Sequence, residues 1–422
     1  MYTETLKKSL LEGKSKRILL YGQHGLGKTY FANNIYEDIR GGFITVNFRS
    51  DDVTEISKQI KAGKDITEAL VTAYRLSEEL LSVTFILDEF TEPCIDKEFI
   101  EKLTETKKEY KYNSLRVIFI TSDVSWAESH SDRFDECVKA DRITFADFLR
   151  KSGDSFYAQV IDAHMTKKKS MPSLIHNELI DMFYQYLTTG GFPRPVAEIT
   201  KENPMVFPDD LAGERYRILI GDICFKEDNK TSAYNKIQII NAIPECSKNS
   251  RFVISKTGRR HLSKQQLESA IEELINDGII IKIPKIGSDS YSLALTDDGI
   301  YSYLLRINRN KLNLTEDRIK ELVTENHIRN LLHNKGIKAY TYAGKYRFKI
   351  NILAESGGKL FPIRVSCSKS TRSPNYDEFI AEYGDKTSFR IHFTESSFSE
   401  SKGTVYLPVY GCEYLEKVIP QQ

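Results

Sequence analysis

A short glycine-rich segment constrains the fold of this chain more than any other feature. Residues 22–29 read Gly-Gln-His-Gly-Leu-Gly-Lys-Thr and match the pattern G-x-x-x-x-G-K-[ST] at every fixed position. The apolar run 17–21 before it predicts a β-strand, and the run 28–40 after it, with apolar residues at helical spacing and a Gly-Gly stop, predicts a helix. Strand, glycine turn and helix in this order predict a parallel α/β sheet with a phosphate-binding loop.

The residue types of this loop predict its chemistry. Glycines let backbone N–H groups curve around a phosphate, and the start of the helix adds the positive end of its dipole. Lys28 is expected to reach the β- and γ-phosphates, and the Thr29 hydroxyl to ligate Mg²⁺. We therefore predict a site for ATP and Mg²⁺; an ordinary glycine-rich turn is the alternative. The predicted binding residues are Gly22, Gln23, His24, Gly25, Leu26, Gly27, Lys28 and Thr29.

The run Phe85-Ile86-Leu87-Asp88-Glu89 predicts a second part of the same site. An apolar strand that ends in Asp places a carboxylate at the sheet edge, where Asp88 is expected to hold Mg²⁺. Glu89 is expected to act as the general base that activates water. A further strand follows at 115–121, and this spacing is typical of the P-loop branch in which that strand lies between the loop strand and the acidic strand. Without the glycine loop, the pattern alone would be weak.

Five residues are candidates for three accessory roles. Thr121 and Ser122 end the strand where a γ-phosphate sensor would stand. Asn47, in the predicted strand 43–48, is a candidate for restraining Glu89. Hydroxyl and amide caps at strand ends are the alternative reading of all three. Arg133 and Arg194 are candidate arginine fingers, although most arginines are solvated or paired on a surface.

Composition places the chain among soluble multidomain proteins. Its 422 residues exceed what one core holds, and 60 Lys and Arg against 59 Asp and Glu leave a charge of +1, so no strong field draws it to a polyanion. We find no apolar run long enough for a membrane and no secretory signal in residues 1–16. The six scattered cysteines contain no C-x-x-C pair. A cytosolic protein without a membrane partner is expected, with no metal beyond nucleotide-bound Mg²⁺.

The alternation of strands and helices ends after Arg150. Ser173 is expected to cap a helix over 174–188 that closes at Gly190 and Gly191. Two helices followed by two short strands then give the outline of a winged helix. The expected elements are helices 233–245 and 264–276, strands 279–284 and 291–295, a helix near 315–334, and strands 346–354 and 360–365.

Two longer motifs resemble a known family. The segment 142–149, Arg-Ile-Thr-Phe-Ala-Asp-Phe-Leu, is similar to one that follows the sensor strand in the AAA+-related, STAND-type ATPases called the archaeal-type ATPase family, also found in bacteria. Asp147 stands where that family usually has Glu. The segment 186–193, Tyr-Leu-Thr-Thr-Gly-Gly-Phe-Pro, closely resembles the lid motif of the family. The resemblance spans nearly the whole chain, strongly to about Pro195 and loosely beyond.

The resemblance implies four parts. These are a P-loop ATPase core at 1–150, a helical lid at 151–215, a winged helix-turn-helix at 216–305 and, at 306–422, an α/β domain like a restriction endonuclease. Asn351, Arg364 and Ser366 stand where the nuclease members have Asp, Glu and Lys. A metal-dependent nuclease needs carboxylates around its cation, so nuclease activity is not expected, although Glu325 and Glu355 lie nearby in sequence.

Two basic segments are candidates for contact with DNA. The first, before the predicted recognition helix, comprises Arg251, Lys256, Arg259, Arg260, His261 and Lys264, but Glu268, Glu272 and Glu273 on that helix favour protein packing equally. The second interleaves Lys335, Lys338, Lys345, Arg347 and Lys349 with Tyr340, Tyr342, Tyr346 and Phe348, a pattern that a half-buried strand explains better.

Together these observations predict a Mg²⁺-dependent ATPase that acts as a nucleotide-driven switch on a protein or DNA partner, or as a homo-oligomer. The alternative is a nucleotide-binding scaffold or DNA-binding regulator with negligible hydrolysis. The presence of Lys28, Asp88 and Glu89 favours ATP hydrolysis over nucleotide binding alone.

Overall fold

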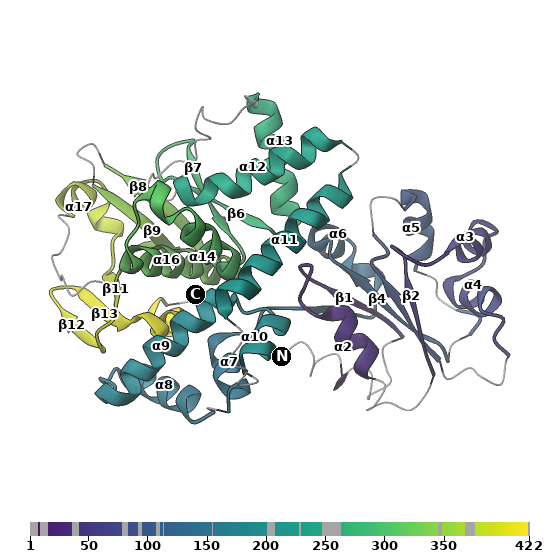
Figure 1. The fold of residues 1–422 in the computed structure, drawn as a ribbon, viewed down its shortest axis with the longest axis horizontal. Coiled ribbons are helices and arrows are strands. Elements are labelled where there is room, and N and C mark those ends of the chain that lie inside the picture. Colours follow the sequence, from purple (N-terminus) through teal and green to yellow (C-terminus); the bar gives the residue numbers. More distant parts are fainter. Residues whose placement is uncertain are drawn as a thin grey trace. The chain divides into compact units, whose positions relative to one another are not determined.

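The computed structural model describes residues 7–8, 16–35, 42–77, 83–91, 95–106, 110–112, 114–153, 155–200, 207–227, 229–246, 263–344, 348–367 and 376–420. The chain forms two compact units, Met1–Arg142 and Ile143–Gln422 (Figure 1). The units have separate sheets. The predicted division at residues 150, 215 and 305 is finer than this and stays a prediction.

The first unit is built on a five-stranded parallel sheet. Its strands are β1 (Arg17–Tyr21), β2 (Gly42–Asn47), β3 (Val83–Asp88), β4 (Arg116–Thr121) and β5 (Glu136–Lys139). They lie in the order β2-β3-β4-β1-β5, and every neighbouring pair is parallel. Strand β4 therefore lies between the loop strand β1 and the acidic strand β3, as predicted. The predicted α/β fold class is confirmed.

Helices alternate with these strands and bury the sheet. They are α2 (Lys28–Asn34), α3 (Thr54–Lys61), α4 (Ile66–Ala73), α5 (Lys97–Leu103) and α6 (Val124–Ser129). All six residues of β3 are buried, so both of its faces are covered, as is typical of a parallel sheet.

Two predicted helix boundaries differ from the structure. The sequence predicts a capping pair of Asp65 and Glu68 ahead of a helix over 69–81. The cap is confirmed, since Asp65 accepts a 3.0 Å hydrogen bond from the backbone N–H of Glu68, but α4 already begins at Ile66. It ends at Ala73, and Arg75 follows with a φ of 50°. The last residues predicted for the helix 28–40 lie outside the described residues.

The second unit begins with a succession of helices. They are α7 (Phe145–Lys151), α8 (Ser155–Lys167), α9 (Ser173–Thr189), α10 (Pro193–Thr200), α11 (Pro208–Lys226), α12 (Lys230–Cys246) and α13 (Lys264–Asn276). The predicted cap of α9 is wrong, because Pro172 occupies the N-cap position and Ser173 is already helical. Its predicted end is confirmed, since Gly190 adopts a left-handed conformation with a φ of 83°.

An antiparallel strand pair and three helices follow. Strands β6 (Ile280–Pro284) and β7 (Tyr291–Leu295) form a two-stranded sheet directly after α13. Helices α14 (Asp298–Ile307), α15 (Arg309–Leu312) and α16 (Glu316–Asn334) lead into the last part of the chain.

A six-stranded mixed sheet forms the last part. Its strands are β8 (Lys338–Ala343), β9 (Lys349–Ser356), β10 (Lys359–Ser366), β11 (Arg390–Thr394), β12 (Ser399–Ser401) and β13 (Thr404–Pro408), in the order β12-β13-β11-β10-β9-β8. Strands β10, β11 and β13 are parallel to one another, whereas β8, β9 and β12 pair antiparallel. Helices α17 (Asp377–Tyr383) and α18 (Leu415–Val418) complete it.

The motif 186–193 packs backbone against backbone on the start of α14. A Cβ atom on Gly190 would lie 2.6 Å from Asp297 Oδ1 and 2.9 Å from the Gly299 nitrogen. A Cβ atom on Gly299 would in turn lie 2.8 Å from the Thr188 carbonyl oxygen. Both positions therefore require glycine, and the two segments are held in close contact.

The same motif also holds the first residue of the second unit. The backbone N–H of Ile143 donates a 2.8 Å hydrogen bond to the Gly191 carbonyl, and the Tyr186 hydroxyl donates a 3.0 Å bond to the Ile143 carbonyl. Arg215 packs over the ring of Phe192 and bonds to Asp297. The motif is thus a packing centre of the second unit.

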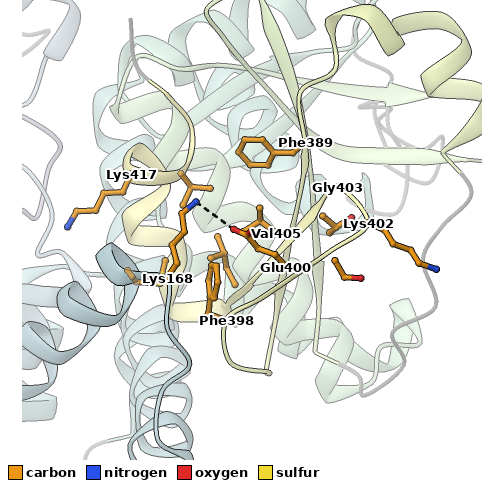
Figure 2. Close-up of a pocket in the computed structure, with 13 residues that line it drawn as sticks. Lys168, Phe389, Phe398, Glu400, Lys402, Gly403, Val405 and Lys417 are labelled. Atoms are coloured by element: carbon orange, nitrogen blue, oxygen red, sulfur yellow. Dashed lines mark ion pairs between the residues drawn. The ribbon is translucent and has the colours of Figure 1, made fainter.

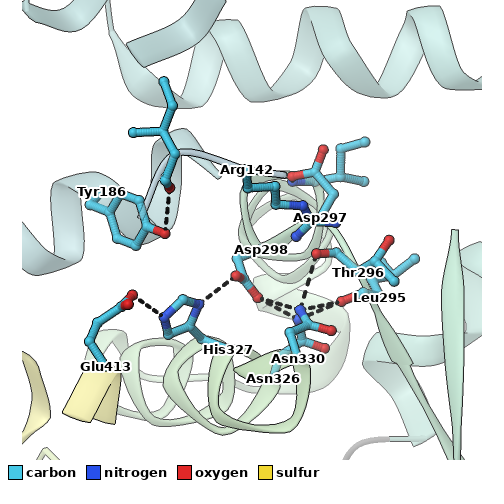
Figure 3. A network of polar contacts seen from close by, with 12 residues as sticks. Arg142, Tyr186, Leu295, Thr296, Asp297, Asp298, Asn326, His327, Asn330 and Glu413 are labelled. Atoms are coloured by element: carbon cyan, nitrogen blue, oxygen red, sulfur yellow. Dashed lines mark hydrogen bonds and ion pairs between the residues drawn. The ribbon is translucent and has the colours of Figure 1, made fainter. Parts of the chain in front are cut away.

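A buried polar network lies beside this centre (Figure 3). His327 on α16 contacts Asp298 Oδ2 through Nδ1 at 2.8 Å and Glu413 Oε1 through Nε2 at 3.0 Å. The side-chain amides of Asn326 and Asn330 donate to the other Asp298 oxygen. Burial opposes a charge on the imidazole, but Asp298 and Glu413 outweigh it and raise the pKa of His327 well above its usual value.

Across the described residues, none of the helices combines the length and apolarity that a membrane span requires.

Candidate nucleotide-binding site

The glycines of residues 22–29 adopt backbone conformations that other residues avoid. Gly22 has a φ of 144°, and a Cβ atom there would lie 2.6 Å from the Ala140 carbonyl oxygen. Gly25 and Gly27 have φ values of 84° and 74°, and Gly27 is the N-cap of α2. The loop therefore turns tightly from β1 into α2, and its shape depends on glycine at these positions.

Lys28 is buried inside this loop. Its Nζ donates hydrogen bonds to the carbonyl oxygens of Gly22 at 2.8 Å and Gln23 at 3.0 Å. A third bond of 3.1 Å reaches Ser122 Oγ, just beyond the end of β4. The ammonium group thus lies at the carboxyl edge of the sheet, where the predicted phosphates would be bound.

Thr29 and Asp88 meet across the sheet edge. The Thr29 hydroxyl lies 2.9 Å from Oδ1 and 3.0 Å from Oδ2 of Asp88. Burial and the neighbouring charge of Glu89 raise the pKa of Asp88 to about 6, against the opposing effects of Thr29, Lys28 and His24. A hydroxyl and a carboxylate in contact are oxygen ligands of the kind Mg²⁺ prefers, so these two residues fit the predicted metal.

Glu89 is held by a serine hydroxyl. It is 9% exposed and has a φ of 53°, an uncommon conformation for a residue other than glycine. Ser122 Oγ donates a 2.7 Å hydrogen bond to Glu89 Oε1. Strained backbone at a buried carboxylate is typical of functional positions.

The accessory candidates Asn47, Thr121 and Ser122 have different hydrogen-bond partners in the structure. Asn47 Nδ2 donates to Asp88 Oδ2 at 3.3 Å, so its described bond goes to the other acid and the restraint on Glu89 comes from Ser122. The Thr121 hydroxyl is fully buried, bonds to Thr91 and accepts a 3.0 Å bond from the Asp123 backbone. These contacts of Thr121 are typical of a strand-end cap, whereas Ser122 contacts Lys28 and Glu89; the sensor roles of both residues stay predictions.

The two candidate arginine fingers form ion pairs with glutamates in their own units. Arg133 pairs with Glu101 at 2.7 Å and donates to Thr104 Oγ1. The Thr104 carbonyl in turn accepts from Arg17, the first residue of β1, so Arg133 lies at the opposite edge of the sheet. Arg194 belongs to the second unit, where its exposed side chain pairs with Glu214.

Sequence reasoning missed an arginine that does contact the loop. Arg142 follows β5 and donates a 2.8 Å hydrogen bond to Gln23 Oε1. The neighbouring Ala140 crowds Gly22, so residues 140–142 form one wall of the loop. The only signal available was that Arg142 opens the segment 142–149, which was read as a family motif and not as part of the site.

The residues at the nuclease-like positions, Asn351, Arg364 and Ser366, do not come together in one site. Asn351 Nδ2 donates to Glu325 Oε1 on α16 at 2.9 Å. Ser366 instead contacts His392 Nε2 at 2.8 Å, and Arg364 lies on the same side of β10 as Ser366. Val365, which lies between Arg364 and Ser366 in β10, packs in the main core together with residues of α16. Ser366 therefore lies on the face of the sheet opposite to α16, whereas Asn351 contacts α16.

The predicted DNA-contact segments are mostly committed to other contacts or lie outside the described residues. Glu268 pairs with Lys282 and accepts from the Tyr291 hydroxyl, and Glu273 pairs with Lys236. Tyr340 donates to Glu355, and Tyr342 is buried, as in a half-buried strand. Positions 251–261 and 345–347 fall outside the described part of the chain. Within the part that is described, no group of three or more His, Cys, Asp or Glu side chains is placed so that it could hold a metal ion.

The strand order and the phosphate loop together define a P-loop α/β fold.

No protein-family model and no curated protein matches the chain. Among solved structures, a Walker-type ATPase of Pyrococcus abyssi is 13% identical with a TM-score of 0.43, over 72% of this chain and 94% of that one. The ORC2 protein of Aeropyrum pernix is 12% identical with a TM-score of 0.36, over 74% and 93%. RuvB of Thermotoga maritima, a Holliday junction branch migration motor, is 15% identical with a TM-score of 0.34, over 67% and 87%. At such low values, the fold and site rest on this chain's own strand order and contacts.

Proposed function

We propose that the chain is a Mg²⁺-dependent ATPase that acts as a nucleotide-driven conformational switch on a protein or DNA partner. The observation that carries this proposal is the meeting of four groups at one sheet edge. Lys28 and Glu89 share the Ser122 hydroxyl as a hydrogen-bond partner, and Thr29 contacts Asp88 beside them. A cation, a metal-binding pair and a buried base are the groups that phosphoryl transfer to water requires.

Each residue has a distinct part in the proposed reaction. The loop N–H groups and Lys28 bind and orient the phosphates, and Thr29 with Asp88 hold the metal. Mg²⁺, when bound, neutralises charge on the phosphate oxygens. Glu89 accepts the proton of the attacking water, and Ser122 fixes the direction of the Glu89 carboxylate.

A second candidate function is a nucleotide-holding scaffold or DNA-binding regulator that hydrolyses ATP negligibly. The hydrogen bond from Ser122 favours it, because this bond occupies one oxygen of Glu89. Arg133 also lies at the sheet edge opposite the loop. An arginine finger at this position could therefore contact only a nucleotide bound to another copy of the chain.

We further propose that residues 216–305 form a winged helix, and that 306–422 form a nuclease-like domain without nuclease chemistry. The succession of α13 and the antiparallel β6–β7 pair supports the first part. The divergence of Asn351 and Ser366 supports the second. DNA or RNA cleavage in Mg²⁺ or Mn²⁺ that disappears on Glu325→Ala or Glu355→Ala would contradict the second part.

One experiment separates the two candidate functions. The ATP hydrolysis rate is measured with and without DNA, beside the mass of the ATP-bound species. Hydrolysis that needs Mg²⁺ and vanishes in Glu89→Gln supports the ATPase. Tight ATP binding with no turnover under any of these conditions supports the scaffold.

A further inference from the structure

The parallel part of the C-terminal sheet is polar on one face. Parallel strands are usually buried on both faces and read as continuous apolar runs. Strands β11 and β13 and the last residues of β10, Arg364 to Ser366, alternate instead between polar and apolar side chains. Their apolar side packs in the main core, with the registered rows Ile363–Ile391–Val405 and Val365–Phe393–Leu407.

The opposite face carries basic, aromatic and hydroxyl side chains in register. One row across four strands consists of Arg364, His392, Tyr406 and Ser399, and a second row consists of Arg390, Thr404 and Ser401. Arg364, Arg390, Thr404 and Tyr406 are half-buried, and both serines are exposed. We call these seven residues the polar face.

A cavity of about 770 Å³ continues the polar face at the carboxyl ends of β10 and β11. Most of its lining offers hydrogen bonds, from Asn177, Ser366, Thr394, Ser396, Ser399 and Tyr406. Ligands of open α/β sheets bind preferentially at this end of parallel strands. The cavity is large enough for a nucleobase or a ligand of similar size.

Positive charge lies over the sheet, and the cavity rim carries charges of both signs. The Arg390 guanidinium is 5.3 Å from the centre of the Tyr376 ring. Burial and the Arg364 charge lower the pKa of His392 to about 4, so the imidazole is neutral near pH 7. At the rim, Glu395 accepts from the Tyr184 hydroxyl and lies 3.7 Å from Lys320, and Asp181 lies nearby.

We propose that the polar face binds a single strand of nucleic acid. Arg364 and Arg390 pair with phosphates, and the Tyr406 ring stacks on a base at the mouth of the cavity. Basic side chains beside an aromatic ring on a sheet surface recognise single strands, because every base has a stacking face. The cavity lining offers mainly hydroxyls and the Asn177 amide, so the base points into the cavity while the phosphate backbone follows the arginines.

This proposal rests on the proposed function in one respect: it identifies a nucleic-acid strand as the partner on which the ATPase would act. Strand binding is measured without ATP, and ATP binding without the strand. The failure of either result is therefore visible separately.

A residue beside the β12–β13 hairpin, outside the polar face, supplies a matched control. A second cavity, of about 520 Å³, lies there between α8, α18 and the β12–β13 hairpin (Figure 2). Lys417 lines it and pairs with Asp162, and Val405 forms part of its apolar wall. Lys417→Ala removes one positive charge from the same region of the unit but not from the polar face.

Fluorescence anisotropy tests the proposal on the full chain. The probes are labelled oligothymidylate and oligouridylate of about 20 nucleotides and a duplex of equal length. Tyr406→Ala is expected to weaken single-strand binding about tenfold or more, and Tyr406→Phe to leave it unchanged. Arg364→Ala is expected to weaken it and to reduce the salt slope by about 0.7. Lys417→Ala is expected to bind like the parent.

Several outcomes overturn the proposal. They are absence of binding at micromolar protein, preference for the duplex, and equal losses in Tyr406→Ala and Tyr406→Phe. Parent-like binding in both Tyr406→Ala and Arg364→Ala also overturns it. Displacement of the oligonucleotide by oligoglutamate at equal concentration would assign the polar face to an acidic protein instead. Thermal unfolding of each variant shows whether a loss reflects misfolding, and the Tyr406→Phe comparison decides the matter where Arg364→Ala does not fold.

Discussion

Ser122 donates its hydroxyl hydrogen to Glu89 over 2.7 Å and accepts a hydrogen from Lys28 over 3.1 Å. One side chain therefore connects the cation of the phosphate loop to the candidate general base. Because Lys28 and Glu89 lie on different segments, the length of this connection depends on the end of β4 staying in register between β1 and β3.

Lys28→Ala is expected to weaken ATP binding by about 2 kcal/mol or more, over tenfold in Kd, because charged hydrogen bonds to phosphate are lost. The fold should persist, since the loop geometry depends on its glycines. Isothermal calorimetry measures the affinity and circular dichroism the fold. Lys61→Ala, on the exposed end of α3, is the control. Parent-like affinity in Lys28→Ala would contradict the loop assignment.

Glu89→Gln is expected to reduce ATP hydrolysis by about 10² to 10⁴ while leaving ATP binding intact. The glutamine oxygen still accepts the bond from Ser122, so the geometry is kept and only the base is removed. Single-turnover hydrolysis and equilibrium binding are measured together. Glu128→Gln, which changes an exposed carboxylate on α6, is the control. An unchanged rate would exclude Glu89 as the base.

Mg²⁺-dependent nucleotide affinity is expected to rise with pH. The metal binds the Asp88 carboxylate in its charged form, and the pKa of Asp88 is about 6, so affinity should increase between about pH 5 and 7 and then level off. Calorimetry with Mg²⁺ and ATP across this range measures the effect. Asp88→Asn corrects for the titration of ATP itself, and identical pH profiles in parent and variant would refute the role of Asp88.

Gly190→Ala is expected to lower the free energy of unfolding by about 2–4 kcal/mol. About 1 kcal/mol comes from the left-handed backbone, and about 1–3 from the overlap with Asp297 and Gly299. Gly153→Ala is the matched control, because Gly153 has a similar φ of 85° and, chain neighbours apart, no atom of the described residues lies within 4 Å of where its Cβ would stand. It should cost about 1 kcal/mol. Urea unfolding measures both, and equal losses would show that the close contact is unimportant.

The stability of the chain is expected to decrease as pH rises above about 7. His327 has a folded pKa above its unfolded value of about 6.5, so its contribution is complete below that value and is lost as pH rises through the folded pKa. Urea unfolding at several pH values measures the slope. His327→Gln should flatten it, whereas His164→Gln should not. A parent-like slope in His327→Gln would assign the effect to other groups.

The nucleotide site was largely predictable because its signals are local. Residues 22–29 carry a fixed pattern, and the apolar run ending at Asp88 and Glu89 is a complete buried strand. The sheet order then brought Thr29 and Asp88 together, as the chain order of strands suggested. Strand β5 and the Arg142–Gln23 bond were missed, because β5 is short, begins and ends with charged residues, and has no apolar run.

The C-terminal sheet was predictable only in part. Its middle strands, β9 and β10, contain clear apolar runs, although β9 begins later than predicted. Strands β11 and β13 alternate between apolar and polar residues, as Arg390 and His392 in β11 illustrate. A short alternating segment resembles many exposed loops, so only tertiary pairing identifies it as part of a parallel sheet.

The contact between Gly190 and Gly299 limits how the chain can be divided for study. Two backbone segments are in direct contact there. No side chains lie between them that could rearrange to cover the exposed backbone if the chain were divided. Fragments that separate 151–215 from 216–305 would each expose main-chain atoms that are now covered, and would be prone to misfold when expressed alone. Truncation studies should therefore keep residues 143–422 together, and assign roles inside this unit by point substitution.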